Sequence, residues 1–178
     1  MKRIVSILLL AAMLLGLCAC GKEPGKTPGK TEEKLPDKIT AAYQTLGDDM
    51  KYVKTLPDPM KLDIAASEYH ATYYLGLSAE EARKDVKEAY VSCAEIQPST
   101  YECAIVRAAD GVSGEDLLRR MLDGNDLYKW ICTGAQNAGG VVCGDVILMV
   151  TGSNEQIGAV CDAFAAQNEG TGEIAYKK

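Results

Sequence analysis

Two short apolar segments around a glycine turn constrain the fold of this chain more than any other feature. Val141-Val142-Cys143 and Val146–Val150 are separated only by Gly144-Asp145. A glycine at the first central position can take the positive φ of a type II′ turn, which suits a two-residue hairpin. The pattern therefore predicts a β-hairpin and commits this part of the chain to an antiparallel sheet.

A second pair of strands is predicted upstream. Tyr101–Ala108 is rich in β-branched and apolar residues and needs a partner strand. Residues 89–96 can supply it through a turn at Gln97-Pro98-Ser99. Alternatively, Val86, Tyr90 and Cys93 could continue a helix that begins at Ala79. We favour the strand, and the choice between strand and helix for 89–96 stays open at this stage.

Serine caps predict three helices. Ser78 and Ser153 are each followed three residues later by Glu81 or Gln156, as in a capping box, and Ser113 precedes two acidic residues. We expect the Ser113 helix to break near Gly124 and to resume through Tyr128, Trp130 and Ile131. Apolar residues at three-and-four spacing predict two more helices, over Ile39–Val53 and Leu62–Leu75.

These elements define the expected fold class. They predict an α+β domain with a small four-stranded antiparallel sheet in ββαββα order, helices packed on one face, and one or two helices in front. Residues after Asn168 are expected to be frayed.

The N-terminal residues predict the cellular location of the protein. Lys2 and Arg3 precede an apolar run from Ile4 to Leu17, and Leu17-Cys18-Ala19-Cys20 ends it. This order resembles the lipobox of bacterial lipoproteins, which implies that residues 1–19 are a signal peptide and that Cys20 carries lipid. The competing interpretations are a transmembrane helix, for which the run is too short, and an ordinary secretory peptide cut elsewhere. The expected location is the extracytoplasmic face of the cell membrane.

The segment after the anchor has the composition of a tether. Residues 20–38 are rich in proline, glycine and lysine and contain Leu35 as their one large apolar side chain. Such a segment buries too little apolar surface to order itself, so we expect a disordered spacer followed by one globular domain over 39–178.

Charge and composition exclude one class of partner. The segment from Ile39 onward has 12 basic and 21 acidic residues, a net charge of −9. Phosphate backbones would repel this domain, and no basic patch interleaves with aromatic residues, so nucleic acid is not an expected partner.

The order of elements is similar to that of a known group. Residues 101–110, the helix after Ser113 and residues 141–151, together with the lipobox and tether, resemble the domain-of-unknown-function family 4358 of Gram-positive lipoproteins. That resemblance implies the fold and the address. The family carries no agreed activity or ligand, so it implies no site residues.

Cysteines are the compositional oddity of the chain. If residues 89–96 and 100–108 pair symmetrically about Pro98, then Cys93 and Cys103 lie opposite each other and could form a disulfide. The alternative is that the cysteines are small buried thiols. The cysteines beyond Cys20 are Cys93, Cys103, Cys132, Cys143 and Cys161.

Candidate catalytic groups are few. His70 is the only histidine and falls in a predicted surface helix, where a solvated imidazole is expected. No His/Cys cluster has metal-ligand spacing, and the acidic residues around Gly124 lack the spacing of a calcium loop, so no metal or cofactor is expected. Acidic residues along one predicted helix suit a solvated face. They are Glu80, Glu81, Asp85 and Glu88.

Tyrosines point to the remaining function class. An amphipathic aromatic suits a binding surface, although half-buried positions explain most of them. The tyrosines concerned are Tyr69, Tyr73, Tyr74, Tyr90, Tyr101 and Tyr128. We therefore favour a non-enzymatic module that binds an envelope protein or a small ligand. The alternative is an envelope enzyme that uses a reactive cysteine, Cys132 or Cys161, or paired carboxylates.

Overall fold

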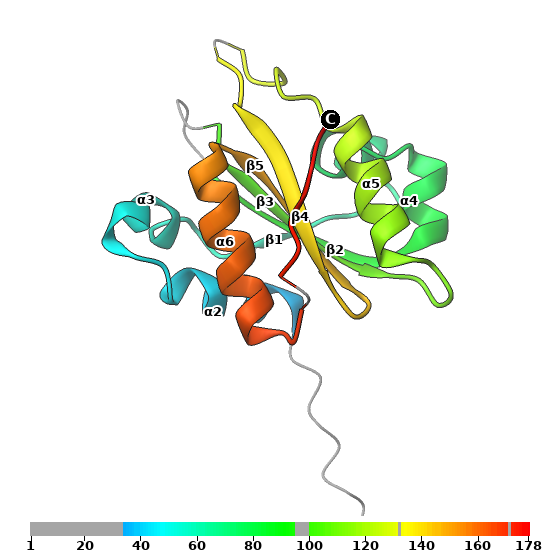
Figure 1. The fold of residues 1–178 in the computed structure, drawn as a ribbon. Coiled ribbons are helices and arrows are strands. Elements are labelled where there is room, and N and C mark those ends of the chain that lie inside the picture. The colour runs from blue at the N-terminus through cyan, green and yellow to red at the C-terminus, as the bar shows by residue number, and fades with distance from the viewer. Residues whose placement is uncertain (1–33, 95–99, 132, 171) are drawn as a thin grey trace, which may run out of the picture. The chain divides into compact units, whose positions relative to one another are not determined.

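A computed structural model describes residues 34–94, 100–131, 133–170 and 172–178. Within them the chain forms one open antiparallel sheet of six strands in the order β1-β2-β3-β5-β4-β6 (Figure 1). The strands are β1 (Met60–Lys61), β2 (Val86–Cys93), β3 (Glu102–Ala108), β4 (Asn137–Cys143), β5 (Val146–Gly152) and β6 (Ala175–Tyr176). The predicted signal peptide, Cys20, residues 20–33 of the tether, the turn at 97–99 and Cys132 lie outside the described residues.

Helices connect and cover these strands. The prediction of an α+β fold with a single antiparallel sheet is confirmed, but the sheet has six strands rather than four. The helical elements are α2 (Leu35–Gln44), the 3₁₀ turn η1 (Asp48–Met50), α3 (Lys51–Lys54), the π-helical turn η2 (His70–Tyr74), α4 (Ala79–Asp85), α5 (Gly114–Gly124) and α6 (Asn154–Gln167).

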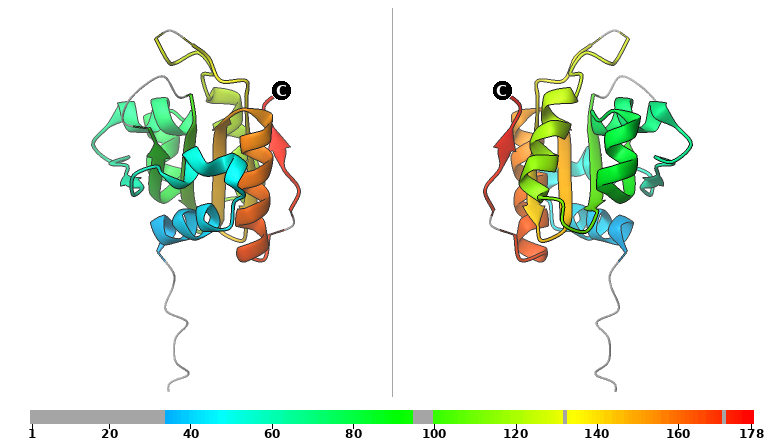
Figure 2. Two further views of the ribbon diagram at one scale, coloured as in Figure 1. Left: turned by 90° about the vertical axis from the view of Figure 1, so that its left-hand side faces the viewer. Right: turned by 90° about the vertical axis from the view of Figure 1, so that its right-hand side faces the viewer.

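The expectation that helices cover one face of the sheet is wrong, because the sheet is covered on both (Figure 2). In β3, Cys103 and Ile105 belong to a core cluster with α2 and α6, whereas Ala104 and Val106 belong to a second cluster with α4, η2 and α5. Side chains alternate along a strand, so β3 and β5 supply both clusters. Nearly every residue of these two strands is buried.

The predicted local signals at turns and caps are confirmed. Gly144 has φ +64° in the turn between β4 and β5. Ser78 and Ser153 form capping boxes at the starts of α4 and α6, and the Ser113 hydroxyl accepts a hydrogen bond from the Asp116 N–H at the start of α5. Residues 89–93 are strand, as favoured, although β2 begins earlier, at Val86.

The N-terminal part of the domain differs from the prediction at both of its helices. The predicted helix over 39–53 is divided, because α2 ends before Gly47 and the chain then makes η1 and α3. Helix α2 also begins at Leu35, whose side chain is only 1% exposed, so residues 35–38 belong to the domain and not to the tether. Burial of Leu35 in the core with α6 outweighs the polar composition around it.

Edge pairing replaces much of the second predicted helix. Met60–Lys61 pairs with β2, and the Leu62 N–H continues the ladder by donating to the Ala89 carbonyl. Only residues 68–75 of the predicted segment, which include η2, are helical. Residues 128–131 are also not helical. After Asn168 the chain is not simply frayed, since β6 pairs with β4. The Lys177 ammonium then donates to the Leu122 and Asp123 carbonyls at the end of α5.

We expect Gly124→Ala to destabilise the domain. A methyl group at Gly124 would overlap the backbone carbonyl of Gly76, itself held at φ +65°, so the backbone must shift. Overpacking of this kind costs about 1–3 kcal/mol. Gly158, inside α6, is the matched control: a methyl group there meets nothing within 4 Å, so Gly158→Ala should gain up to about 1 kcal/mol from helix propensity. Urea unfolding of both variants tests this, and equal effects would contradict it.

Candidate functional site

A buried ion pair lies where β3 begins. Glu102 is the first residue of β3, and its carboxylate accepts a hydrogen bond of 2.7 Å from the Lys129 ammonium. The two side chains are only 3% and 4% exposed. Lys129 comes from the segment of residues 125–131 that follows α5, so the pair joins that segment to the sheet.

The Lys129 ammonium makes further contacts with η2 and with its own neighbour. It donates to the Tyr73 carbonyl at 2.7 Å and lies 4.7 Å from the centre of the Tyr73 ring. It also lies 5.2 Å from the centre of the Trp130 ring. A cation between two aromatic faces is attracted to the ring electrons of both. Strand β3, turn η2 and residues 125–131 therefore meet at one ammonium group.

Three of the predicted tyrosines gather beside this group. Tyr69 stacks on Tyr73 at 4.8 Å between ring centres, and Tyr74 packs edge-on against both. Burial raises the pKa values of Tyr73 and Tyr74 to about 12, so both are neutral phenols at physiological pH. Tyr101 lies apart in the first core cluster, where its hydroxyl donates to that of Tyr43.

His70 is not the freely solvated imidazole that the sequence suggested. Its Nδ1 accepts a hydrogen bond of 2.8 Å from the Asp63 N–H, and its ring packs against Tyr74. The half-buried ring thus ties η2 to the chain after β1 and has one nitrogen already engaged.

Large apolar side chains are exposed around the buried pair. Tyr69 is 56% exposed, Tyr128 is 79% exposed and Ile131 is fully exposed. We call these three residues the distal surface, because the segment of residues 125–131, which carries two of them, lies at the end of the domain opposite the start of α2 (Figures 1 and 2). Near that other end, Lys38 of α2 donates to Asn168, just after α6. The start of α2 and residues 125–131 therefore lie at opposite ends of the domain.

Burial also changes the acidity of Glu102. Its pKa is raised from the ordinary value of 4.5 to about 7, because desolvation of the carboxylate outweighs the attraction and hydrogen bond from Lys129. The pair was missed at the sequence level. A single glutamate at the start of a mostly apolar strand was the available signal.

The described cysteines do not form the predicted hairpin disulfide. The strand register places Cys103 opposite Ser92 and Cys93 opposite Glu102, one residue away from symmetry about Pro98. The one-residue difference sends the two cysteines to opposite faces of the sheet, Cys103 into the first core cluster and Cys93 against the second. That prediction is therefore wrong in its register. Burial raises the pKa values of the thiols of Cys103, Cys143 and Cys161.

The predicted helix of acidic residues is shorter than expected, and two of its carboxylates bind an arginine. Helix α4 ends at Asp85, so Glu88 lies on β2. Arg120 contacts Asp85 at 2.8 Å and Glu81 at 3.3 Å. Hydrogen bonds from Ser78, and to a smaller extent the one from Arg120, lower the pKa of Glu81 below its usual range. In the described residues, no three His, Cys, Asp or Glu side chains are grouped as metal ligands.

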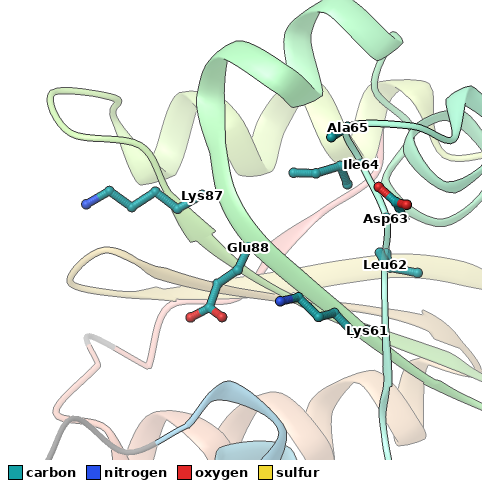
Figure 3. A pocket seen from close by; sticks show the side chains of 7 residues that line it. All are labelled: Lys61, Leu62, Asp63, Ile64, Ala65, Lys87 and Glu88. Carbon is teal, nitrogen blue, oxygen red and sulfur yellow. The ribbon is translucent and has the colours of Figure 1, made fainter.

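A hollow of about 450 Å³ lies beside the outer edge of β2 (Figure 3). Lys61–Ala65 line one side, and Lys87 and Glu88 line the other. Its charged side chains point in different directions (Figure 3), and Lys87 is already paired with Asp110 at 2.6 Å. These exposed, diverging groups do not converge on a ligand position, so the distal surface is the better candidate site.

Comparison with models of protein families, with curated proteins and with solved structures found no match. The resemblance to family 4358 therefore stays a prediction. None of the helices in the described part of the chain has the length and apolar composition needed to cross a bilayer.

Glu102 should make the stability of the domain depend on pH in a defined direction. Between pH 4.5 and about 7 the folded protein holds the Glu102 proton and the unfolded chain does not, so the contribution of this group to the free energy of unfolding falls as pH rises. Glu102→Gln cannot titrate and should remove that fall. Urea unfolding of both proteins across this range measures the difference, and parallel pH profiles would contradict the assignment.

Proposed function

We propose that this protein is a membrane-anchored extracytoplasmic lipoprotein that acts as a non-enzymatic binding module. The order of basic residues, apolar run and Leu17-Cys18-Ala19-Cys20 supports the anchor, through lipid on Cys20. Its resemblance to family 4358 is consistent with the same address and is part of the proposal.

One observation carries the binding role: Tyr128 and Ile131 are 79% and 100% exposed, and the segment of residues 125–131 that carries them lies at the end of the domain opposite α2 (Figure 1). Clustered aromatic and aliphatic side chains are enriched where proteins bind partners, and a tyrosine supplies both apolar area and a hydroxyl.

The negative charge of the domain restricts the chemical class of the proposed partner. The domain from Ile39 has a net charge of −9, and the exposed carboxylates of Glu68 and Asp126 adjoin the distal surface. An anionic lipid surface or a polyanion would be repelled there. We therefore propose an envelope protein, or a small ligand without strong negative charge, as the partner.

The alternative is an envelope enzyme that uses a reactive cysteine or paired carboxylates. A cysteine nucleophile needs a lowered pKa. The thiols of Cys103, Cys143 and Cys161 have raised pKa values. The paired carboxylates of Glu81 and Asp85 both form ion pairs with Arg120. Cys132 lies outside the described residues. These contacts favour the binding module.

Cys20→Ala should abolish lipid attachment. Without the sulfur no acyl lipid can be attached at this position, but the apolar run of Ile4–Leu17 then stays uncut and can itself hold the chain at the membrane, so the lipid itself is the quantity to measure. Incorporation of radiolabelled palmitate into the protein measures the result. Cys18→Ala is the matched control, which should incorporate the label. Labelling of Cys20→Ala would contradict lipidation at Cys20.

The distal surface should be required for partner binding. We expect Tyr128→Ser combined with Ile131→Ser to abolish a specific crosslink in intact cells, because the two substitutions remove most of the exposed apolar area. Crosslinking, affinity capture and mass spectrometry compare this variant with the wild type and with Cys20→Ala.

Tyr52→Ser is the matched control for that experiment. Tyr52 is 43% exposed but belongs to α3, away from the distal surface. The partner should survive this substitution. A partner captured equally by all variants would place the binding site elsewhere on the domain.

A further inference from the structure

Among the described residues, a small number of hydrogen bonds joins the segment that carries Tyr128 and Ile131 to the rest of the domain, and its Leu127 side chain packs against the second core cluster. At its start, the Asn125 side chain donates to the Thr151 hydroxyl of β5 at 2.8 Å. Two residues later, the Leu127 carbonyl accepts a hydrogen bond from the Ala135 N–H. Beyond Leu127, the buried ammonium of Lys129 is the contact that joins the segment to both β3 and η2.

The buried ion pair carries a desolvation cost that an apolar contact holding the same loop would not have. Burying two charges carries a large desolvation penalty, and replacing a buried ion pair by apolar side chains of similar volume is often neutral or stabilising. Leucine and methionine would fill the space between Tyr73 and Trp130 without that penalty. A buried pair is useful where one particular geometry is required, since its hydrogen bonds are directional.

Lys129 lies where such geometry controls the distal surface. Tyr128 precedes it, Trp130 follows it as one wall of its site, and Ile131 comes next. On the other side of the ammonium, Tyr73 carries Tyr69 stacked on its ring. All three residues of the distal surface are thus within two residues, or one ring contact, of the Lys129 site.

We propose that Lys129 is a positioning residue, which latches residues 125–131 to β3 and η2 and so sets the geometry of the distal surface. This inference rests on the proposed function for its purpose, but the latch itself is a property of the isolated domain. Without the latch, the segment beyond Leu127 moves independently of the sheet while the core clusters remain packed.

Trp130 makes the latch measurable. It is the single tryptophan of the chain, it is only 8% exposed, and its ring contacts the Lys129 ammonium. We expect Lys129→Met to raise the acrylamide quenching constant of Trp130 severalfold and to speed hydrogen exchange within 125–131. Glu102→Gln, which keeps the ammonium beside Trp130 and is milder, should change both readouts in the same direction. Full-length protein in detergent micelles is the sample.

Two further variants separate positioning from stability. Lys87→Met removes an exposed lysine from a pair of similar length, with Asp110, and should change neither readout. The double variant Glu102→Gln with Lys129→Met replaces the pair by uncharged groups of similar size. Its urea unfolding midpoint, lowered in Lys129→Met, should return toward the wild-type value. The acrylamide quenching constant of Trp130 should stay as high as in Lys129→Met.

The outcomes are distinct. Unchanged quenching and exchange in both single variants would overturn the latch, as would a double variant that restores the wild-type values of every readout, because the pair would then act through stability alone. These measurements use no partner. A latch without any captured partner would refute only the binding role, and a captured partner with no latch would refute only this inference.

Discussion

Coverage of two apolar strands on both faces is the constraint on which the rest of this structure depends. Strands β3 and β5 lie side by side at the centre of the sheet, and their side chains point alternately into two separate core clusters. Neither face could be left to water without exposing a row of large apolar groups. Helices α2 and α6 must therefore cover one face, and α4, η2 and α5 the other. The loops between these layers, including residues 125–131, are placed by that arrangement.

Local signals in the sequence predicted the elements well where a single residue decides the geometry. The capping serines and Gly144 are examples, because each depends on neighbours a few residues away. Prediction failed where a distant segment decides. Leu35 is drawn into α2 by the core, and residues 60–62 are drawn into strand geometry by the edge of β2. The unbroken apolar run of Val146–Val150 was a local signal that both faces of this strand are buried, because a strand with one solvated face alternates between apolar and polar residues.

The candidate site was predictable only in part. The tyrosines were visible as a class of residue, but the contact of Tyr69 with Tyr74, five residues later, depends on the π-helical spacing of η2. The ion pair of Glu102 with Lys129 spans 27 residues. The hairpin disulfide failed by one position, because symmetry about Pro98 is a weaker determinant of register than the core face to which Cys103 belongs. A strand side chain that changes register by one residue changes face, and no local pattern around the turn reveals which face is apolar enough to receive it.

The outermost strands, β1 and β6, each contribute only two residues to the sheet. Long, flat outer strands serve as templates on which neighbouring molecules add their own strands. Lipid anchoring confines proteins to two dimensions, where neighbours meet far more often than in free solution. Such short borders give adjacent copies little backbone to pair with. For the proposed lipid-anchored protein, contacts between neighbouring copies would therefore have to be made by side chains and not by added strands.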